Sequence, residues 1–197
     1  MIAEDQTMVR QALVALLELE PDLDVVAQAA DGNEAIAMAR KHQPDVAVLD
    51  IEMPGASGIQ VASQLSASGF DGRIIIVTTF DRPGYLRAAM AAGARGFLLK
   101  DAPAADLAAA IRRVAAGERV VDPALAAAAL AQGDSPLTDR EGEVLAAAAS
   151  HDAIADIAAR LHLSPGTVRN HLSAAIQKLG ARNRAEAAQI AQQKGWL

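Results

Sequence analysis

The sequence has 197 residues, enough for one large domain or two of modest size, and a formal net charge of -6 at pH 7. Apolar residues make up 52% of it and aromatic residues only 3%, so a hydrophobic core must be built from aliphatic side chains and alanine. The absence of cysteine excludes a disulfide framework, thiol catalysis and cysteine-based zinc sites.

No apolar stretch approaches the roughly 20 residues of a membrane-spanning helix. The longest run of alanine and leucine is Ala124 to Ala131, and no charged and then apolar leader opens the sequence. We therefore expect a soluble cytoplasmic protein that makes no contact with a membrane.

Short β-branched runs alternate with helical patterns over residues 1–120. Strands are expected at Ile2–Glu4, Val25–Ala29, Val46–Asp50, Ile74–Thr79 and Gly96–Lys100. Helices are expected near residues 6–19, 32–42, 57–68, 83–92 and 103–116. This alternation is typical of βαβ units, so we expect an α/β, flavodoxin-like domain with a parallel five-stranded sheet.

Several helix boundaries have their own signals. Asp31 followed by Glu34 has the spacing of a capping box, Pro103 suits a first helical turn, and Gly117 suits a helix exit. The first strand is expected to be short, since only Met1, Ile2 and Ala3 precede the acidic pair.

The pattern changes to an alanine-rich stretch after residue 120. Residues 121–136 are predicted to form a mostly helical linker that closes with Gly133-Asp134-Ser135-Pro136. Residues 137–197 then read as helical throughout. Thr138 and Glu141 form a capping box, and Ser164-Pro165 starts a later helix. Two helices joined by a tight turn predict an all-α helix-turn-helix domain.

Charge is divided unevenly between these parts. Residues 137–197 carry a net charge of +1, so the remainder of the chain carries -7. A nearly neutral domain binds DNA if its basic groups gather on one face, although the expected electrostatic attraction is modest.

Polar side chains lie at or beside the ends of four predicted strands. These are Glu4 and Asp5, Asp50, Thr78 and Lys100. Parallel strands meet at one edge of the sheet, where open α/β sheets bind ligands. Three carboxylates with an amine and a hydroxyl there predict a Mg²⁺-assisted phosphate site.

Each of these groups has a predicted role. Asp50 is the expected nucleophile and a metal ligand, with Asp5 as a direct ligand, Glu4 as a ligand through water, and Glu52 as a ligand through its carbonyl oxygen. Lys100 and Thr78 are expected to bind phosphate oxygens.

The same residues resemble the receiver domain of bacterial two-component response regulators. The similarity lies in Glu4-Asp5, residues 48–55, Gly58, residues 77–79 and residues 97–101. It implies that a sensor histidine kinase phosphorylates Asp50 with Mg²⁺ present, and that Thr78 and Phe97 move together as a switch. The resemblance also places Glu52 and Phe80 beside the path of hydrolytic water, and the bulk of Phe80 predicts a long-lived acyl phosphate.

The last 61 residues resemble the LuxR-type DNA-binding domain. The matching segments are 137–141, 143–145, 157–158, Leu161, 163–164, 167–171, 178–180 and 184–187. Together with the receiver, this domain defines the NarL/FixJ group of response regulators. Within that group the chain resembles DesR-like regulators of lipid desaturase expression.

The second helix of a helix-turn-helix enters the major groove with its first turns against the bases. Arg169 and Asn170 are therefore predicted base contacts, because Arg pairs with guanine and Asn with adenine in two-pronged fashion. Ser173 shares their face. Four further residues are predicted to contact phosphate: Thr167, Lys178, Arg182 and Arg184.

The resemblance implies a transcription regulator that is not an enzyme beyond its own phosphorylation and autodephosphorylation. Phosphorylation of Asp50 is expected to promote a homodimer, through the first and fifth helices in this group, and binding to double-stranded DNA. One alternative is an aspartyl-phosphate phosphatase, because Asp50-Ile51-Glu52 superficially resembles the DxD motif of haloacid-dehalogenase enzymes. The other is a receiver whose helical module binds protein.

Overall fold

The computed structural model of the chain describes residues 1–79, 83–131, 135–149 and 153–197. Its contacts divide it into two compact units. Residues 1–81 and 88–126 form the first unit, and residues 82–87 and 127–197 form the second.

The first unit contains a six-stranded sheet in the order β2-β1-β3-β4-β5-β6, with every pairing parallel. The strands are β1 (Ile2–Ala3), β2 (Gln28–Ala29), β3 (Val46–Leu49), β4 (Arg73–Thr78), β5 (Gly96–Leu99) and β6 (Val120–Val121). The five predicted strands are all present, and the flavodoxin-like order is confirmed. No pattern in the sequence indicated β6.

Four of the five predicted strands are shorter than expected, and the second strand is shortened the most. The strand predicted at Val25–Ala29 is paired only at Gln28–Ala29, because its neighbour β1 offers just Ile2 and Ala3 as partners. The hydrogen bond from the Ile2 N–H to the carbonyl of Ala27 marks where this pairing begins.

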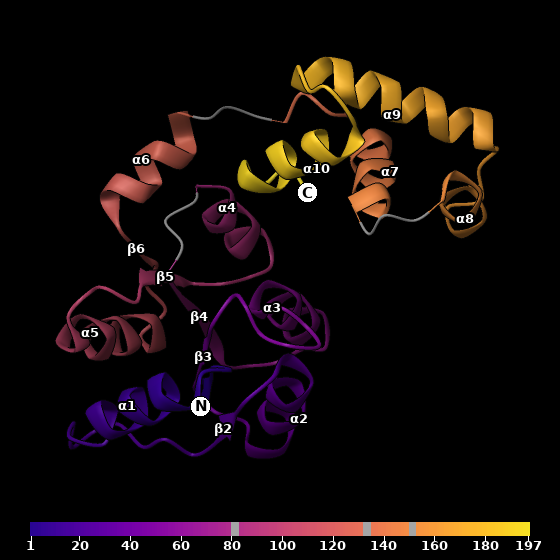
Figure 1. Cartoon of the computed structure of the whole chain (residues 1–197). Helices are drawn as coiled ribbons and strands as arrows, with labels where there is room; N and C mark the ends of the chain where they lie inside the picture. The colour runs from indigo at the N-terminus through magenta and orange to yellow at the C-terminus, as the bar shows by residue number, and fades with distance from the viewer. Residues whose placement is uncertain (80–82, 132–134, 150–152) are drawn as a thin grey trace. The chain divides into compact units, whose positions relative to one another are not determined.

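Helices cover both faces of this sheet. They are α1 (Thr7–Leu17), α2 (Gly32–His42), α3 (Gly58–Ala67) and α5 (Ala104–Ala115), while α4 (Pro83–Ala91) has residues in both units. Figure 1 shows α1 and α5 on one side of the strands and α2 and α3 on the other. The core between the sheet and the α1–α5 side includes Val48, Ile75, Leu107 and Val114.

The register places the carboxyl ends of the central strands side by side. Ala3 pairs with Leu49, Leu49 pairs with Ile76, and Thr78 pairs with Leu99. Strand order reverses between β1 and β3, whose neighbours on the outside are β2 and β4. Such a reversal is where open α/β sheets hold their ligands.

The second unit is helical. After α6 (Pro123–Ala131) come α7 (Asp139–Ala149), α8 (Ile154–Arg160), α9 (Pro165–Leu179) and α10 (Arg184–Gln193). The predicted capping box at Thr138 is present, since its hydroxyl accepts from the Glu141 N–H and the Glu141 carboxylate accepts from the Thr138 N–H. Ser164 caps α9, with Pro165 in its first turn.

The helices α7 to α10 share one core. Its fully buried members include Val144, Leu145, Ile157 and Val168, with Trp196 packed at the edge. Aliphatic and alanine side chains fill it, as the composition predicts. No helix in the described ranges is long and apolar enough to cross a membrane.

Candidate functional site

Three carboxylates meet at the edge where β1 and β3 end. Glu4, Asp5 and Asp50 each offer an oxygen atom, and these atoms lie within 4.8 Å of one another. Backbone pairing sets this geometry, because the Asp50 N–H donates to the carbonyl of Ala3 and the Glu4 N–H donates to the carbonyl of Ala29. Glu4 and Asp50 are buried, whereas Asp5 is exposed.

The ammonium of Lys100 lies between the two buried acids. Its Nζ is 2.5 Å from Oε2 of Glu4 and 3.1 Å from Oδ2 of Asp50. Burial alone would lower the pKa of Lys100, but the hydrogen bonds to Glu4 and Asp50 outweigh it and raise the pKa. Lys100 is therefore positively charged at neutral pH.

Asp50 is a buried carboxylate with few donors. Its Oδ1 accepts from the N–H of Ile51 at 2.8 Å, and its Oδ2 faces Lys100. Burial raises the pKa of Asp50, and the hydrogen bond from Lys100 opposes that rise. A carboxylate held this way, with one cation beside it, is poorly solvated and available to react.

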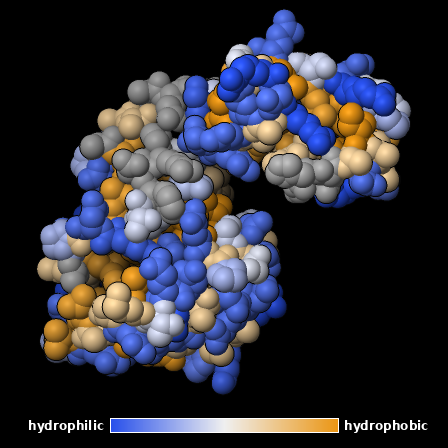
Figure 2. All heavy atoms as spheres, in the orientation of Figure 1, coloured by the Kyte–Doolittle hydropathy of each residue, from blue (hydrophilic) through white to orange (hydrophobic). Residues whose placement is uncertain are grey.

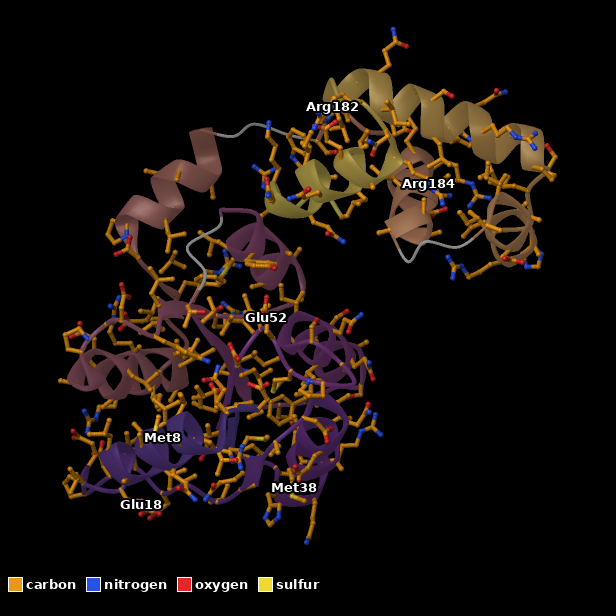
Figure 3. All side chains as sticks on the ribbon, viewed as in Figure 1. Met8, Glu18, Met38, Glu52, Arg182 and Arg184 are labelled. Carbon is orange, nitrogen blue, oxygen red and sulfur yellow. The ribbon has the colours of Figure 1, made fainter. Side chains whose placement is uncertain are left out.

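The donor set fits a hard divalent cation. Mg²⁺ prefers oxygen ligands and is usually held by one or two carboxylates together with water and phosphate oxygens. Three clustered carboxylates balanced by one lysine leave excess negative charge for such an ion. The side chain of Glu52, labelled in Figure 3, is exposed in the loop between β3 and α3. The atom of Glu52 predicted to bind the metal ion is its backbone carbonyl oxygen.

The predicted switch residues lie within the sheet. Thr78 ends β4 and is fully buried, and its carbonyl accepts from the Lys100 N–H at 2.8 Å. Phe97 in β5 is also fully buried, and it pairs with Ile76 on one side and with Val121 of β6 on the other. Phe80 lies outside the described residues.

Close backbone packing fixes the loop after Asp50. A side chain at Gly58 would place its Cβ 1.9 Å from the Asp50 carbonyl oxygen, so only glycine fits there. Ser57 caps α3 with a complete capping box to Gln60. The Ser57 and Gln60 spacing was present in the sequence and was missed as a start signal.

The predicted base-reading residues share the outer face of α9. Arg169, Asn170 and Ser173 are exposed, whereas Val168 and Leu172 of the same helix are buried in the core. The Thr167 N–H donates to Oγ of Ser164, and the two hydroxyl oxygens are 2.8 Å apart. Thr167 thus forms part of the cap of α9.

Carboxylates already neutralise two of the predicted phosphate contacts. Nζ of Lys178 is 2.6 Å from Oε2 of Glu141, and the Arg182 guanidinium pairs with Glu186 at 3.0 Å. Figure 3 labels Arg182 and Arg184, which lie before α10 and at its start. Arg169 makes no side-chain hydrogen bond or ion pair in the described part of the chain.

Comparison with known families accounts for both units. The model of the response regulator receiver domain matches residues 1–112, which is more than half of the chain. The model of bacterial regulatory proteins of the luxR family matches residues 135–191. The chain belongs to the two-component response regulators. It combines a receiver with a LuxR-type DNA-binding domain, which makes it a transcription regulator of the NarL type.

Relatives match this response regulator over its whole length. It is 50% identical to the uncharacterised transcriptional regulatory protein YvfU of Bacillus subtilis and 46% identical to its transcriptional regulatory protein DesR. Both alignments cover 100% of this chain, with 98% of YvfU and 97% of DesR. The DesR match agrees with the expected subgroup.

A solved structure of the response regulator RcsB in complex with DNA is also similar. It is 26% identical, with a TM-score of 0.67 over 98% of this chain and 96% of that one. The matches to a receiver and to a DNA-binding family favour a transcription regulator over the phosphatase and the protein-binding module.

Proposed function

We propose that this response regulator is switched by phosphorylation of Asp50, with Mg²⁺ held by Glu4, Asp5, Asp50 and the Glu52 carbonyl. The observation that carries the proposal is the cluster of three carboxylates within 4.8 Å, with Lys100 against two of them. When bound, Mg²⁺ would neutralise the repulsion between Asp50 and an incoming phosphoryl group.

The chain's own residues account for the transfer. An Asp50 carboxylate oxygen attacks phosphorus, the bond from phosphorus to the histidine nitrogen of the kinase breaks, and the imidazole keeps the electron pair. Lys100 and the Thr78 hydroxyl then bind oxygens of the new acyl phosphate. Attack by water on phosphorus later returns Asp50 to a carboxylate, which is the autodephosphorylation expected of a receiver.

The acyl phosphate carries roughly two negative charges, on the phosphoryl oxygens, where the Asp50 carboxylate carried one. Lys100 is drawn from Glu4 toward the phosphoryl oxygens, and Thr78 and Phe97 repack. We propose that this repacking shifts the protein toward a homodimer. A dimer presents two copies of α9 to paired DNA half-sites, and each half-site is read by Arg169, Asn170 and Ser173.

Thr167, Arg182 and Arg184 are the proposed phosphate contacts. The exposure of Arg169, Asn170 and Ser173 on one face of α9 supports this interface. The DNA complex of the similar RcsB regulator supports DNA as the partner. We propose domain limits of 1–120 for the receiver, 121–136 for the linker and 137–197 for the DNA-binding domain.

Intact-mass spectrometry tests the modification. After incubation with acetyl phosphate and Mg²⁺, the wild-type chain should gain the mass of one phosphoryl group, and Asp50→Asn should gain none. Asp45→Asn is the matched control, because this exposed aspartate precedes the opposite end of β3. An adduct that persists in Asp50→Asn would overturn the assignment.

Electrophoretic mobility shift with a random DNA pool tests the output. Phosphorylated wild-type protein should retain and enrich a subset of duplexes more tightly than the unmodified protein. Equal retention of DNA by both forms would contradict the proposed switch.

A further inference from the structure

Lys178 and Glu141 form an ion pair between two helices of the DNA-binding domain. Lys178 lies in the last turn of α9, and Glu141 lies in the first turn of α7. Their charged atoms are 2.6 Å apart, and 37 residues separate them in the sequence. The side chain of Glu141 is only 8% exposed, and that of Lys178 is 37% exposed.

Two donors bind the carboxylate of Glu141. The oxygen that faces Lys178 also accepts the Thr138 N–H at 2.8 Å, which completes the cap of α7. A nearly buried carboxylate needs such donors, because an unpaired buried charge costs far more than the pair contributes. Releasing Lys178 to a DNA phosphate would therefore leave Glu141 with a backbone N–H as its main donor.

The pair fixes the far end of the recognition helix. The predicted base-reading residues Arg169, Asn170 and Ser173 are in the first two-thirds of α9, before Lys178. Polar contacts also hold α8 against α7. Arg140 of α7 donates to the Leu161 carbonyl at 2.8 Å, and Arg160 of α8 donates to the Ala147 carbonyl at 3.1 Å. Glu141 and Lys178 extend this bracing from α7 to α9.

We propose that Lys178 is a positioning residue: it holds α9 at the angle needed for base contact through Glu141, and it does not bind DNA phosphate. The inference rests on the DNA binding proposed above and replaces the phosphate contact predicted for this lysine. Arg182 differs from it, because its side chain is 86% exposed and its partner Glu186 is on the next helix.

The two possible roles of Lys178 predict opposite effects of Glu141→Gln on DNA affinity. If Lys178 binds phosphate, Glu141→Gln removes a competing anion and strengthens DNA binding. If Lys178 positions α9, Glu141→Gln loosens the helix and weakens binding. Glutamine keeps an oxygen that accepts the Thr138 N–H, so the cap of α7 is retained.

The experiment measures affinity of the full-length phosphorylated chain for a DNA duplex that the wild-type protein has enriched from a random pool. Lys178→Gln and Glu141→Gln should each weaken binding by roughly tenfold, the worth of one charge-assisted hydrogen bond. The double variant should be no weaker than either single variant, because both remove the same contact.

Salt dependence supplies an independent readout. A lost phosphate contact lowers the slope of log affinity against log salt by about 0.9, whereas a positioning residue leaves the slope unchanged. Lys178→Gln should keep the wild-type slope, and Arg182→Gln should lower it. A lowered slope for Lys178→Gln, or tighter binding by Glu141→Gln, would overturn the proposal.

Glu143→Gln is the matched control. It removes one negative charge from the same helix, but Glu143 is exposed and pairs with Arg140 rather than with α9. It should bind DNA as well as the wild type or better. If the wild-type protein shows no salt-dependent DNA binding, the proposed function fails. If the wild type binds but the variants do not have the expected affinities, only the positioning role of Lys178 fails.

Folding is followed separately through Trp196, the single tryptophan, which packs against the core of this domain. Affinities are compared at a temperature at which every variant retains the wild-type emission. A loss of affinity that disappears when folded fractions are equal would count against positioning.

Discussion

Lys100 neutralises two buried carboxylates. Its removal should therefore lower the stability of the receiver and strengthen Mg²⁺ binding. Lys100→Gln leaves Glu4 and Asp50 facing each other without a cation. We expect the free energy of unfolding without Mg²⁺ to fall by about 3 kcal/mol, the usual cost of breaking a buried pair. Mg²⁺ should recover part of this loss and bind more tightly than to the wild type, because the competing positive charge is gone.

Calorimetric unfolding with and without Mg²⁺ measures both effects. Arg73→Gln, at the exposed start of β4, is the control and should change neither quantity. Weaker Mg²⁺ binding in Lys100→Gln would show that the lysine does not compete with the cation.

Gly58 is a second residue whose surroundings dictate its identity. Gly58→Ala forces the loop after Asp50 to move, since its Cβ would meet the Asp50 carbonyl at 1.9 Å. We expect a loss of about 1–3 kcal/mol in receiver stability and weaker Mg²⁺ binding. In the control Gly142→Ala, the new Cβ in α7 would lie 4.0 Å from Cδ2 of Leu197, an ordinary contact, and stability should rise by up to about 1 kcal/mol. Equal effects of the two substitutions on melting temperature would refute the steric argument.

At the scale of elements, the capping box of α7 predicts an acid-sensitive helical domain. The hydrogen bond from Lys178, with that from the Thr138 N–H, lowers the pKa of Glu141 from its ordinary value of 4.5. The unfolded chain therefore binds a proton that the folded domain does not, and stability falls as the pH drops from about 4.5 through the lowered pKa.

Urea unfolding followed by Trp196 fluorescence tests this. Wild-type stability should decline over that acidic range, and Glu141→Gln should remove this part of the decline. Glu143→Gln should retain the wild-type profile. A wild-type profile identical to that of Glu141→Gln would contradict the pairing.

The sequence predicted the elements that have strong local signals and missed those that depend on distant partners. Apolar runs ending in Asp50 and Lys100 predicted both the strands and the clustering of their acidic and basic groups. By contrast, Val120-Val121 is too short a run to indicate a strand, and it becomes β6 only because β5 offers a free edge. The Lys178–Glu141 pair was equally hidden, because no local pattern relates positions 37 residues apart.

On the scale of the whole molecule, the surface of α1 is a candidate for self-association. Met8 is 82% exposed and Leu16 is 43% exposed, whereas Leu107, Ile111 and Val114 of α5 are buried. Figure 2 shows apolar atoms on the surface where α1 and α5 lie, and Figure 3 labels Met8 on α1. The sequence could not separate these exposed positions from buried ones, because all of them are apolar.

Met8→Glu should therefore prevent the phosphorylation-dependent dimer by placing a charge in an apolar contact, while Asp50 is still modified. Analytical ultracentrifugation before and after acetyl phosphate treatment measures this. Gln64→Glu, exposed on α3, makes the same change in charge on another helix and should dimerise normally. A normal dimer from Met8→Glu would exclude this face of α1.

The strand β1 consists of two residues, and both acids that follow it depend on its pairing with β2 and β3. Fraying of so short a segment would scatter the carboxylates in a single event, without unfolding the remainder of the receiver. The rate of Asp50 phosphorylation would then depend on the fraction of molecules in which β1 is paired with its neighbours. Hydrogen exchange at Ala3 and Glu4 should slow when magnesium is added, because the cation binds only the closed arrangement.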